Sequence, residues 1–183
     1  MTVTADQLRR SPDHAAEQAA WFEAAFNEHW TRVYSVLFQL VGEQAEAEDL
    51  ALEVFWRLYS RPPRSTENLG GWLYRVSANL GLNALRARKR RLGYEQQAGQ
   101  DALVLGHSSD PVEETERAEK RRLVQATLAR LKPRAARVLI LRHSGLSYAE
   151  IAAALRLPAS SVGTVLARAE AEFEKVYRQI GGE

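Results

Sequence analysis

Residues 146–173 read LSYAEIAAALRLPASSVGTVLARAEAEF, and this stretch predicts two short helices joined by a tight turn. Ser147 and Glu150 have the spacing of a capping box, in which the hydroxyl and the carboxylate each accept a hydrogen bond from a free helix amide. The first helix is expected to end at Leu157-Pro158, because the residue before a proline is disfavoured in the α region. The second helix is expected to begin within residues 158–161.

A further helix is expected immediately before this pair, over residues 134–143. It ends near Gly145, a residue type that suits a left-handed helix C-cap. Three helices with such short connections are typical of a helix-turn-helix, whose last helix enters the DNA major groove. An ordinary helical hairpin is the alternative, because alanine-rich helix pairs with short turns are common.

The composition is that of a globular protein: of 183 residues, 45% are hydrophobic and 26% are charged. The absence of cysteine excludes disulfides and cysteine-ligated zinc, and no cluster of metal ligands or catalytic residues stands out. The first residues lack the apolar core of a secretory signal, and no apolar run suggests a membrane span. We therefore expect a cytoplasmic protein without metal or cofactor.

The net charge is only +2, but charge is unevenly distributed along the chain. Residues 43–53 contain acidic side chains without a base, and residues 86–91 contain basic side chains without an acid. Two oppositely charged faces in one domain suggest two different partners. One or two bases are explained by the dipole at a helix C-terminus, but five in six positions favour contact with phosphates.

The pattern along the whole chain predicts an all-α protein of two small helical domains joined by a flexible linker. The first domain spans residues 15–92, the linker 93–115, and the helix-turn-helix domain 116–181. In the first domain, apolar residues recur at steps of three and four, which predicts a buried helical stripe. This stripe consists of Phe22, Phe26, Trp30, Val33, Tyr34, Leu37 and Leu40. The next helix is expected over 43–59, followed by a loop over 60–71 and a third helix over 72–92.

Two motifs in the first domain and two in the second occur together in one protein family. They are AEDLALEVF at 47–55 and WLYRVSAN at 72–79, then LKPRAAR at 131–137 and GLSYAEIA at 145–152. With these motifs in this order, the chain resembles the bacterial RNA polymerase sigma factors of the extracytoplasmic-function group. The family commonly has glutamine at the position of Leu52, and it lacks the lysine that precedes Pro133.

The resemblance implies roles for residues of the first domain. The acidic helix of the family docks on the coiled coil of the polymerase β′ subunit, a role that falls here to Glu48, Asp49 and Glu53. The third helix and the loop before it hold the single strand of the minus-ten promoter element, by stacking, base-edge hydrogen bonds and phosphate contacts. The residues assigned to this role are Arg64, Asn68, Tyr74, Arg75, Asn79, Asn83, Arg86, Arg88, Lys89, Arg90 and Arg91, with Ser65 as a further loop residue.

In the second domain the resemblance assigns duplex DNA binding to the helix-turn-helix. The residues concerned are Ser147, Tyr148, Ser160, Ser161, Thr164 and Arg168. Three positions that are basic in the family are occupied here by Gly163, Val165 and Glu170, which leaves Arg168. Each lost phosphate contact flattens the salt dependence of binding by roughly 0.9 in log–log slope. The sequence therefore predicts a weakened grip on the minus-thirty-five element.

The function expected from this resemblance is that of a sigma factor, which binds core RNA polymerase and directs promoter recognition, melting and transcription initiation. It is not expected to be an enzyme. Its expected partners are the β′ coiled coil and β flap of core polymerase, promoter DNA and an anti-sigma factor that wedges between the domains. Two alternatives remain: a helix-turn-helix regulator that acts without polymerase, and a sigma-like interaction adaptor that has lost promoter binding.

Overall fold

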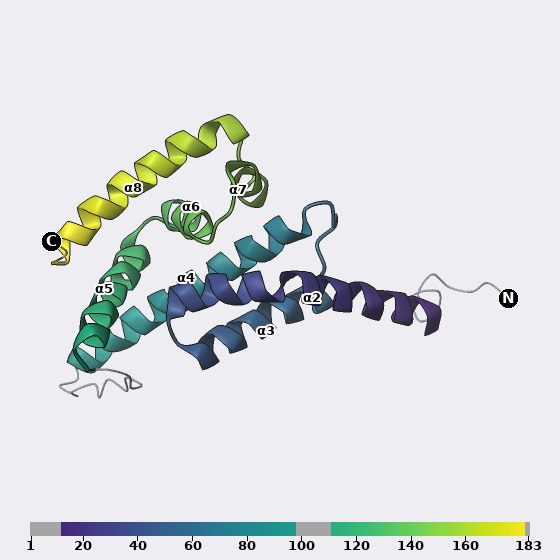
Figure 1. Ribbon diagram of the computed structural model, residues 1–183, viewed down its shortest axis with the longest axis horizontal. Helices are drawn as coiled ribbons and strands as arrows, with labels where there is room; N and C mark the ends of the chain where they lie inside the picture. Colours follow the sequence, from purple (N-terminus) through teal and green to yellow (C-terminus); the bar gives the residue numbers. More distant parts are fainter. Residues whose placement is uncertain (1–11, 98–110, 182–183) are drawn as a thin grey trace.

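Helices form all the regular secondary structure of residues 12–97 and 111–181, the parts of the chain that this computed structural model describes (Figure 1). This confirms the prediction of an all-α protein. In chain order the elements are α2 (Pro12–Val41), α3 (Gln44–Ser60), α4 (Leu69–Gln97), α5 (Pro111–Arg130), α6 (Pro133–His143), α7 (Tyr148–Leu155), the short 3₁₀ helix η1 (Ala159–Ser161) and α8 (Val162–Gln179).

Several helix ends follow from local sequence, and those at Gly145 and Ser147 were predicted. The Glu43 carboxylate accepts hydrogen bonds from the amides of Ala45 (2.9 Å) and Glu46 (2.7 Å), and so caps α3. Ser147 and Glu150 form the expected capping box of α7, with the Ser147 amide donating to Glu150 Oε2 at 2.7 Å. Gly145, with φ at +84°, provides the left-handed turn after α6.

Other helix boundaries differ from the prediction. α4 runs from Leu69 to Gln97 and not from 72 to 92, and α5 begins at Pro111 and not at 116. The basic run at 86–91 therefore lies inside α4, where the dipole at the helix C-terminus does not explain it. α7 ends at Leu155, before the proline, because Arg156 adopts a left-handed conformation (φ 55°) as its C-cap. Residues 98–110, most of the predicted linker, lie outside the described residues.

The first half of the chain is a three-helix unit in which α4 packs against both α2 and α3. Gly81 permits close contact of α4 with α2, since a Cβ atom there would lie 2.5 Å from Leu40 Cδ1. The predicted buried stripe of α2 is only partly buried. Val33, Leu37 and Leu40 are in the core, whereas the aromatic side chains of the stripe remain partly accessible.

The second half packs directly against the first (Figure 1). α4 is the central helix, with α2 and α3 on one side and α5, α6 and α7 on the other. Buried residues of both halves belong to a single hydrophobic cluster. Within the second half, α6, α7 and α8 form the predicted helix-turn-helix. No helix in the described ranges has the length and apolar character needed to cross a membrane.

Candidate functional site

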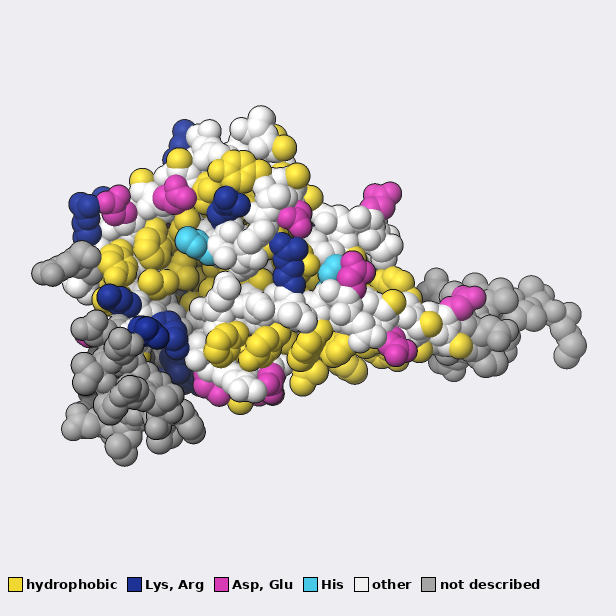
Figure 2. All heavy atoms as spheres, viewed as in Figure 1, with side chains coloured by type: hydrophobic (Ala, Val, Ile, Leu, Met, Phe, Trp, Pro, Cys, Tyr) yellow, Lys and Arg dark blue, Asp and Glu magenta, His cyan; other side chains and the backbone are white. Residues whose placement is uncertain are grey.

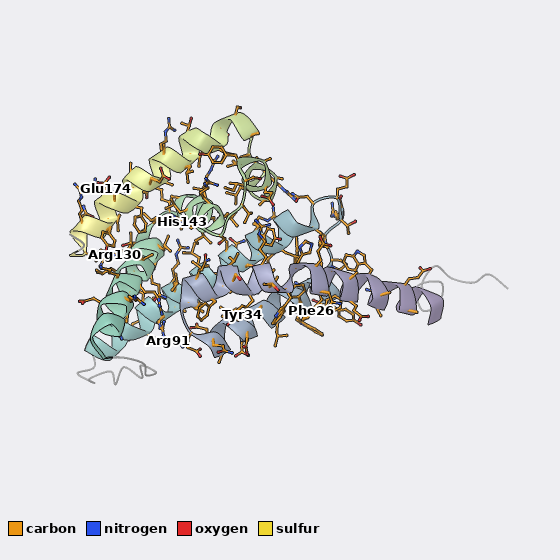
Figure 3. All side chains as sticks on the ribbon, in the orientation of Figure 1. Phe26, Tyr34, Arg91, Arg130, His143 and Glu174 are labelled. Carbon is orange, nitrogen blue, oxygen red and sulfur yellow. The ribbon has the colours of Figure 1, made fainter. Side chains whose placement is uncertain are left out.

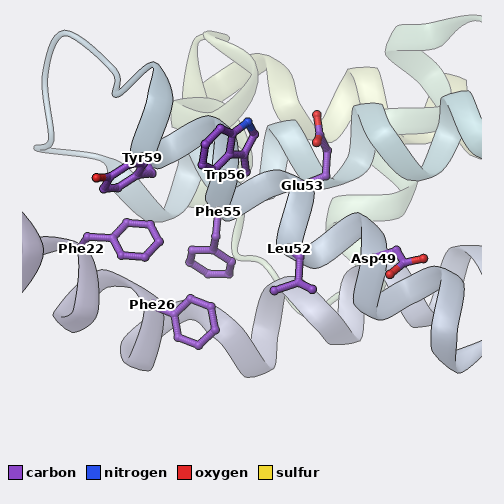
Figure 4. A pocket seen from close by; sticks show the side chains of 8 residues that line it. All are labelled: Phe22, Phe26, Asp49, Leu52, Glu53, Phe55, Trp56 and Tyr59. Carbon is purple, nitrogen blue, oxygen red and sulfur yellow. The ribbon is translucent and has the colours of Figure 1, made fainter.

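An open groove of about 600 Å³ lies between the N-terminal half of α2 and the outer side of α3. Apolar side chains line most of its surface, and two carboxylates lie at the end away from Tyr59 (Figure 4). The lining residues are Phe22, Phe26, Asp49, Leu52, Glu53, Phe55, Trp56 and Tyr59.

The groove exists because α3 has two apolar sides. One side carries its buried residues, which pack against α2 and α4. The other carries Leu52, Trp56 and Tyr59, which are 53%, 61% and 49% exposed. Their spacing of four and three residues places them on one face of the helix. Exposed apolar residues that gather in this way mark an interaction surface, unlike single ones scattered over a protein.

A series of stacked aromatic rings runs along α2 from the groove to positions outside it. Phe26 stacks on Trp30 with ring centroids 4.9 Å apart, and it contacts the ring of Phe55 at 4.7 Å. The stacked series continues through Tyr34 to Phe38, which is 41% exposed. Figure 2 shows the resulting row of hydrophobic side chains at the surface, and Figure 3 labels Phe26 and Tyr34 within it.

The three carboxylates expected to bind a partner lie on or beside this groove. Asp49 and Glu53 line it, and Glu53 pairs with Arg57 one helical turn later at 2.8 Å. Glu48 is not among the lining residues and accepts a hydrogen bond from the Gln44 amide group at 2.8 Å. The groove is therefore apolar at its base and acidic at its rim, which suits a partner with apolar and basic side chains.

A second group of predicted site residues lies on α4. Arg75, Asn79 and Arg86 are separated by four and seven residues, so at about 3.6 residues per turn they share one side of the helix. This side is turned toward the second half of the protein. Burial and the nearby guanidinium groups of Arg156 and Arg137 lower the pKa of Arg75.

Two arginines of the basic run bind backbone carbonyls. Arg86 donates to the carbonyls of Ala129 (3.4 Å) and Leu131 (3.0 Å), at the end of α5. Arg88 donates to the carbonyl of Val41, the last residue of α2, at 3.5 Å. Both therefore satisfy the C-terminal carbonyls of other helices, where positive charge is favourable. The sequence alone does not reveal this role, because it depends on how distant helices meet.

The remaining bases of the run, Lys89, Arg90 and Arg91, are exposed. Burial and the neighbouring Arg130 lower the pKa of Lys89. Figure 3 shows Arg91 on α4 and Arg130 at the far end of α5. These three side chains remain available to an external anion.

Tyr74 is only 5% exposed, although a stacking role on a base requires an accessible ring. Its hydroxyl lies 3.3 Å from His29 Nδ1, and the guanidinium of Arg32 lies 5.2 Å from its ring centroid. Burial raises the pKa of Tyr74, against the opposing effect of Arg32. In this conformation the ring belongs to the packing between α2 and α4.

Four further residues assigned to the minus-ten element are exposed, whereas Arg75, Asn79 and Arg86 are partly buried. Arg64, Ser65 and Asn68 are exposed in the loop before α4, and Asn83 is exposed on α4 itself. Asn68 Oδ1 accepts a hydrogen bond from the Gly71 amide at 3.1 Å, which fixes its side chain at the start of α4.

In the helix-turn-helix, Ser160, Thr164 and Arg168 are exposed at successive steps of four along η1 and α8. Ser147 and Ser161 use their hydroxyls within the protein, in the capping box and in a bond to the Pro158 carbonyl. Tyr148 is 45% exposed beneath the guanidinium of Arg142, 5.5 Å from its ring centroid. Over residues 160–168, Arg168 is therefore the single cation, and it is exposed together with the hydroxyls of Ser160 and Thr164.

Gly163, Val165 and Glu170 occupy the three positions where the family resemblance predicts basic residues, and their surroundings differ. Val165 packs against the hydrophobic core, so it is not a free surface position. Glu170 is exposed and Gly163 is partly buried beside Tyr148. Only Glu170 among them combines full exposure with a charge that repels phosphate.

The aromatic groove and the contacts of Arg32 were not predicted from the sequence. The signal for the groove was present, because Leu52, Trp56 and Tyr59 form a second apolar stripe beside the buried stripe of α3. No local pattern distinguishes Arg32 from other surface arginines. Residues 12–97 and 111–181 contain no group of three or more side chains suited to holding a metal ion.

Comparison with protein families gives two matches. Residues 25–91 match Sigma-70 region 2, and residues 121–173 match Sigma-70 region 4. The groove, except for Phe22, and the side of α4 described above lie in the first match, and the helix-turn-helix, except for the end of α8, lies in the second.

Individual relatives give the same result. The chain is 33% identical over 165 residues to the ECF RNA polymerase sigma factor SigE of Mycolicibacterium smegmatis, covering 85% of this chain and 61% of that protein. It is 29% identical to the RNA polymerase sigma-H factor of Pseudomonas aeruginosa, over 81% of this chain and 82% of that protein. It is 25% identical to the ECF RNA polymerase sigma factor SigW of Bacillus subtilis, over 81% and 84%.

A solved structure shares the fold. It is the co-crystal structure of the sigma factor RpoE in complex with the anti-sigma factor NepR from Bartonella quintana, with a TM-score of 0.50 and 16% sequence identity. The match covers 86% of this chain and 96% of that chain.

Proposed function

The chain belongs to the extracytoplasmic-function sigma factors of the sigma-70 family, and from this we propose that it binds core RNA polymerase and directs promoter-specific initiation. The observation that carries the proposal is the groove between α2 and α3, whose lining residues other than Phe22 lie in the region 2 match. The proposed activity is binding without catalysis, and its proposed place is the cytoplasm. An anti-sigma factor is a further proposed partner.

We assign polymerase docking to the whole groove and not to the acidic residues alone. Leu52, Trp56 and Tyr59 have exposed apolar side chains. Burying this surface on association contributes about 25 cal/mol of favourable binding free energy for each Å² removed from water. Asp49 and Glu53 at the rim attract basic side chains of the β′ coiled coil and set its orientation. Trp56 is the proposed centre of this interface, because large aromatic residues dominate binding energy at such surfaces.

Promoter contacts are assigned to α4, the loop before it and the outer face of α8. The exposed bases Lys89, Arg90 and Arg91 provide phosphate contacts. Asn79 and Asn83 carry both a donor and an acceptor for a base edge. Ser160, Thr164 and Arg168 face outward on the recognition helix for duplex binding.

The test measures the affinity of purified chain for core polymerase, with single substitutions in the groove. Trp56→Ala is expected to weaken binding about 30-fold, since truncating a central aromatic residue costs about 2 kcal/mol. Asp49→Lys is expected to weaken binding by reversing charge at the rim. Phe38→Ala is the matched control, because Phe38 is exposed on α2 but does not line the groove.

Equal affinity of Trp56→Ala and Phe38→Ala would show that the groove is not the docking site. No binding by the wild-type chain, measured without any inhibitor present, would contradict the proposal itself.

A further inference from the structure

A second cavity lies in the helix-turn-helix half of the protein. α6 and α8 pack side by side there (Figure 1), and a cavity of about 270 Å³ opens between the start of α6 and the middle of α8. Its apolar lining consists of Ala135, Val165 and Ala169. Ala135 and Ala169 are buried, and because an alanine side chain ends at Cβ, the two helices leave space between them at this level.

Three cations line this cavity. Lys132, directly before α6, and Arg134 in its first turn lie on one side, and Arg168 of α8 lies on the other. All three side chains are exposed, and they form no ion pair or side-chain hydrogen bond with any residue of 12–97 and 111–181. Arg137 of the same helix, by contrast, donates to the Pro133 carbonyl at 2.9 Å. The three cations are therefore available to an external anion.

One acidic residue, Glu172, also lines the cavity. It is partly buried, and among the described residues it forms no ion pair with any of the three cations. Positive charge therefore exceeds negative charge at the cavity, and such a balance attracts anions.

The cavity adjoins the face of α8 that is assigned to duplex DNA. Arg168 belongs to both, because it is the last of the exposed series Ser160, Thr164 and Arg168 and also lines the cavity. When a recognition helix lies in the major groove, neighbouring parts of the helix-turn-helix contact the DNA backbone. Lys132 and Arg134 thus lie on the side of Arg168 where a backbone phosphate is expected.

Two departures from the family pattern meet at this cavity. The family resemblance predicts a base at position 165, where Val165 lines the cavity, and no lysine before Pro133, where Lys132 lines it. Positive charge is therefore missing from the α8 side of the cavity and present on the α6 side.

We propose that Lys132 and Arg134 bind a phosphate of duplex DNA beside the recognition helix, and that they replace phosphate contacts missing from α8. The proposal rests on the duplex-binding function assigned to α8 above. Such contacts strengthen binding and set the orientation of the protein on the duplex, but they carry no sequence information. The chain therefore binds duplex DNA more tightly than the base-poor α8 alone allows.

The test measures binding of the chain to two labelled duplexes of unrelated sequence, by fluorescence anisotropy at a series of KCl concentrations. Lys132→Gln and Arg134→Gln, made separately, are each expected to reduce the log–log slope of affinity against salt by roughly 0.9. For curves that converge at about 1 M KCl, this slope corresponds to about eightfold weaker binding at about 0.1 M. The reduction should be equal on both duplexes, because every sequence presents phosphates.

Lys175→Gln is the matched control, because it removes the same charge from an exposed position of α8 outside the cavity. It should leave the slope unchanged, and so should Lys132→Arg, which retains the charge. Glu172→Gln should tighten binding, since it removes the acid from the cavity. Lys132→Gln should leave the thermal midpoint unchanged, because the Lys132 side chain makes no capping hydrogen bond to α6.

Wild-type slopes in both Lys132→Gln and Arg134→Gln would overturn the proposal, and so would an equal reduction in Lys175→Gln. A reduction on only one of the duplexes would indicate base reading and would contradict a phosphate contact. A wild-type chain that binds neither duplex would contradict it as well. Affinity for core polymerase is measured in parallel: a chain that does not bind polymerase but shows the reduced slopes would contradict the sigma function and leave the phosphate contact established.

Discussion

Glu150 shows how one residue serves both a helix and the contact between the two halves. Its carboxylate accepts a hydrogen bond from the Ser147 amide and faces Arg32 across the contact. The hydrogen bonds with Ser147 are the main cause that lowers the pKa of Glu150, and the charge of Arg32 adds to them. The first role was predictable from spacing in the sequence, whereas the second depends on tertiary packing.

A pH dependence of stability follows. Because its folded-state pKa is lowered, Glu150 stabilises the fold above the ordinary carboxyl value of 4.5, and this stabilisation is lost as the pH falls through the lower folded value. The free energy of unfolding of wild type should therefore exceed that of Glu150→Gln near neutral pH, and the two should converge in acid. Urea unfolding followed by circular dichroism at several pH values measures the difference.

Arg32→Ala separates the two causes of this effect. It should retain most of the pH dependence, since the bond from the Ser147 amide is unchanged. A constant difference between wild type and Glu150→Gln down to the most acidic pH would contradict the assigned role of Glu150.

At the scale of elements, sequence predicted what depends on local chemistry. The capping box at Ser147 and the glycine turn at Gly145 involve residues within a few positions of each other. The cap at Glu43 is equally local but was not predicted. The groove was not predicted, because the apolar periodicity of α2 indicates a stripe that is buried throughout. Which of its rings stay accessible depends on where α3 packs against α2. The roles of Arg86 and Arg88 were missed for the same reason, as their partners lie more than forty residues away.

The recognition helix α8 allows a prediction about DNA binding. Glu170→Arg replaces an exposed acid by a base, at a position where the family resemblance predicts a base. If the new side chain reaches a phosphate, the log–log dependence of affinity on salt becomes steeper by roughly 0.9. Fluorescence anisotropy of a labelled duplex at several KCl concentrations measures the slope. Val165→Arg is expected to lose stability instead, because Val165 packs against the core.

At the scale of the whole molecule, the two regions form one packed structure, which was not predicted from the sequence. All four tryptophans, at positions 21, 30, 56 and 72, belong to the first half, whereas helices are distributed over both. Tryptophan fluorescence therefore reports on the first half, and circular dichroism at far-ultraviolet wavelengths reports on both.

These two probes should give the same urea midpoint for the free protein, because a shared core unfolds as a unit. Arg32→Ala should move the midpoints apart, as it weakens the contact between the halves. Separate midpoints in the wild-type protein would show instead that the two regions unfold independently.

The most direct test of the central claim is transcription by core RNA polymerase reconstituted with this chain. Genomic DNA of the bacterium that encodes the protein is the template, and transcript starts are mapped by sequencing. A sigma factor should produce discrete transcript starts that core polymerase alone does not produce, and these starts should share a sequence motif upstream. Trp56→Ala should reduce the yield of these transcripts, whereas Phe38→Ala should not. Starts identical with and without the chain would contradict its assignment as a promoter-directing sigma factor.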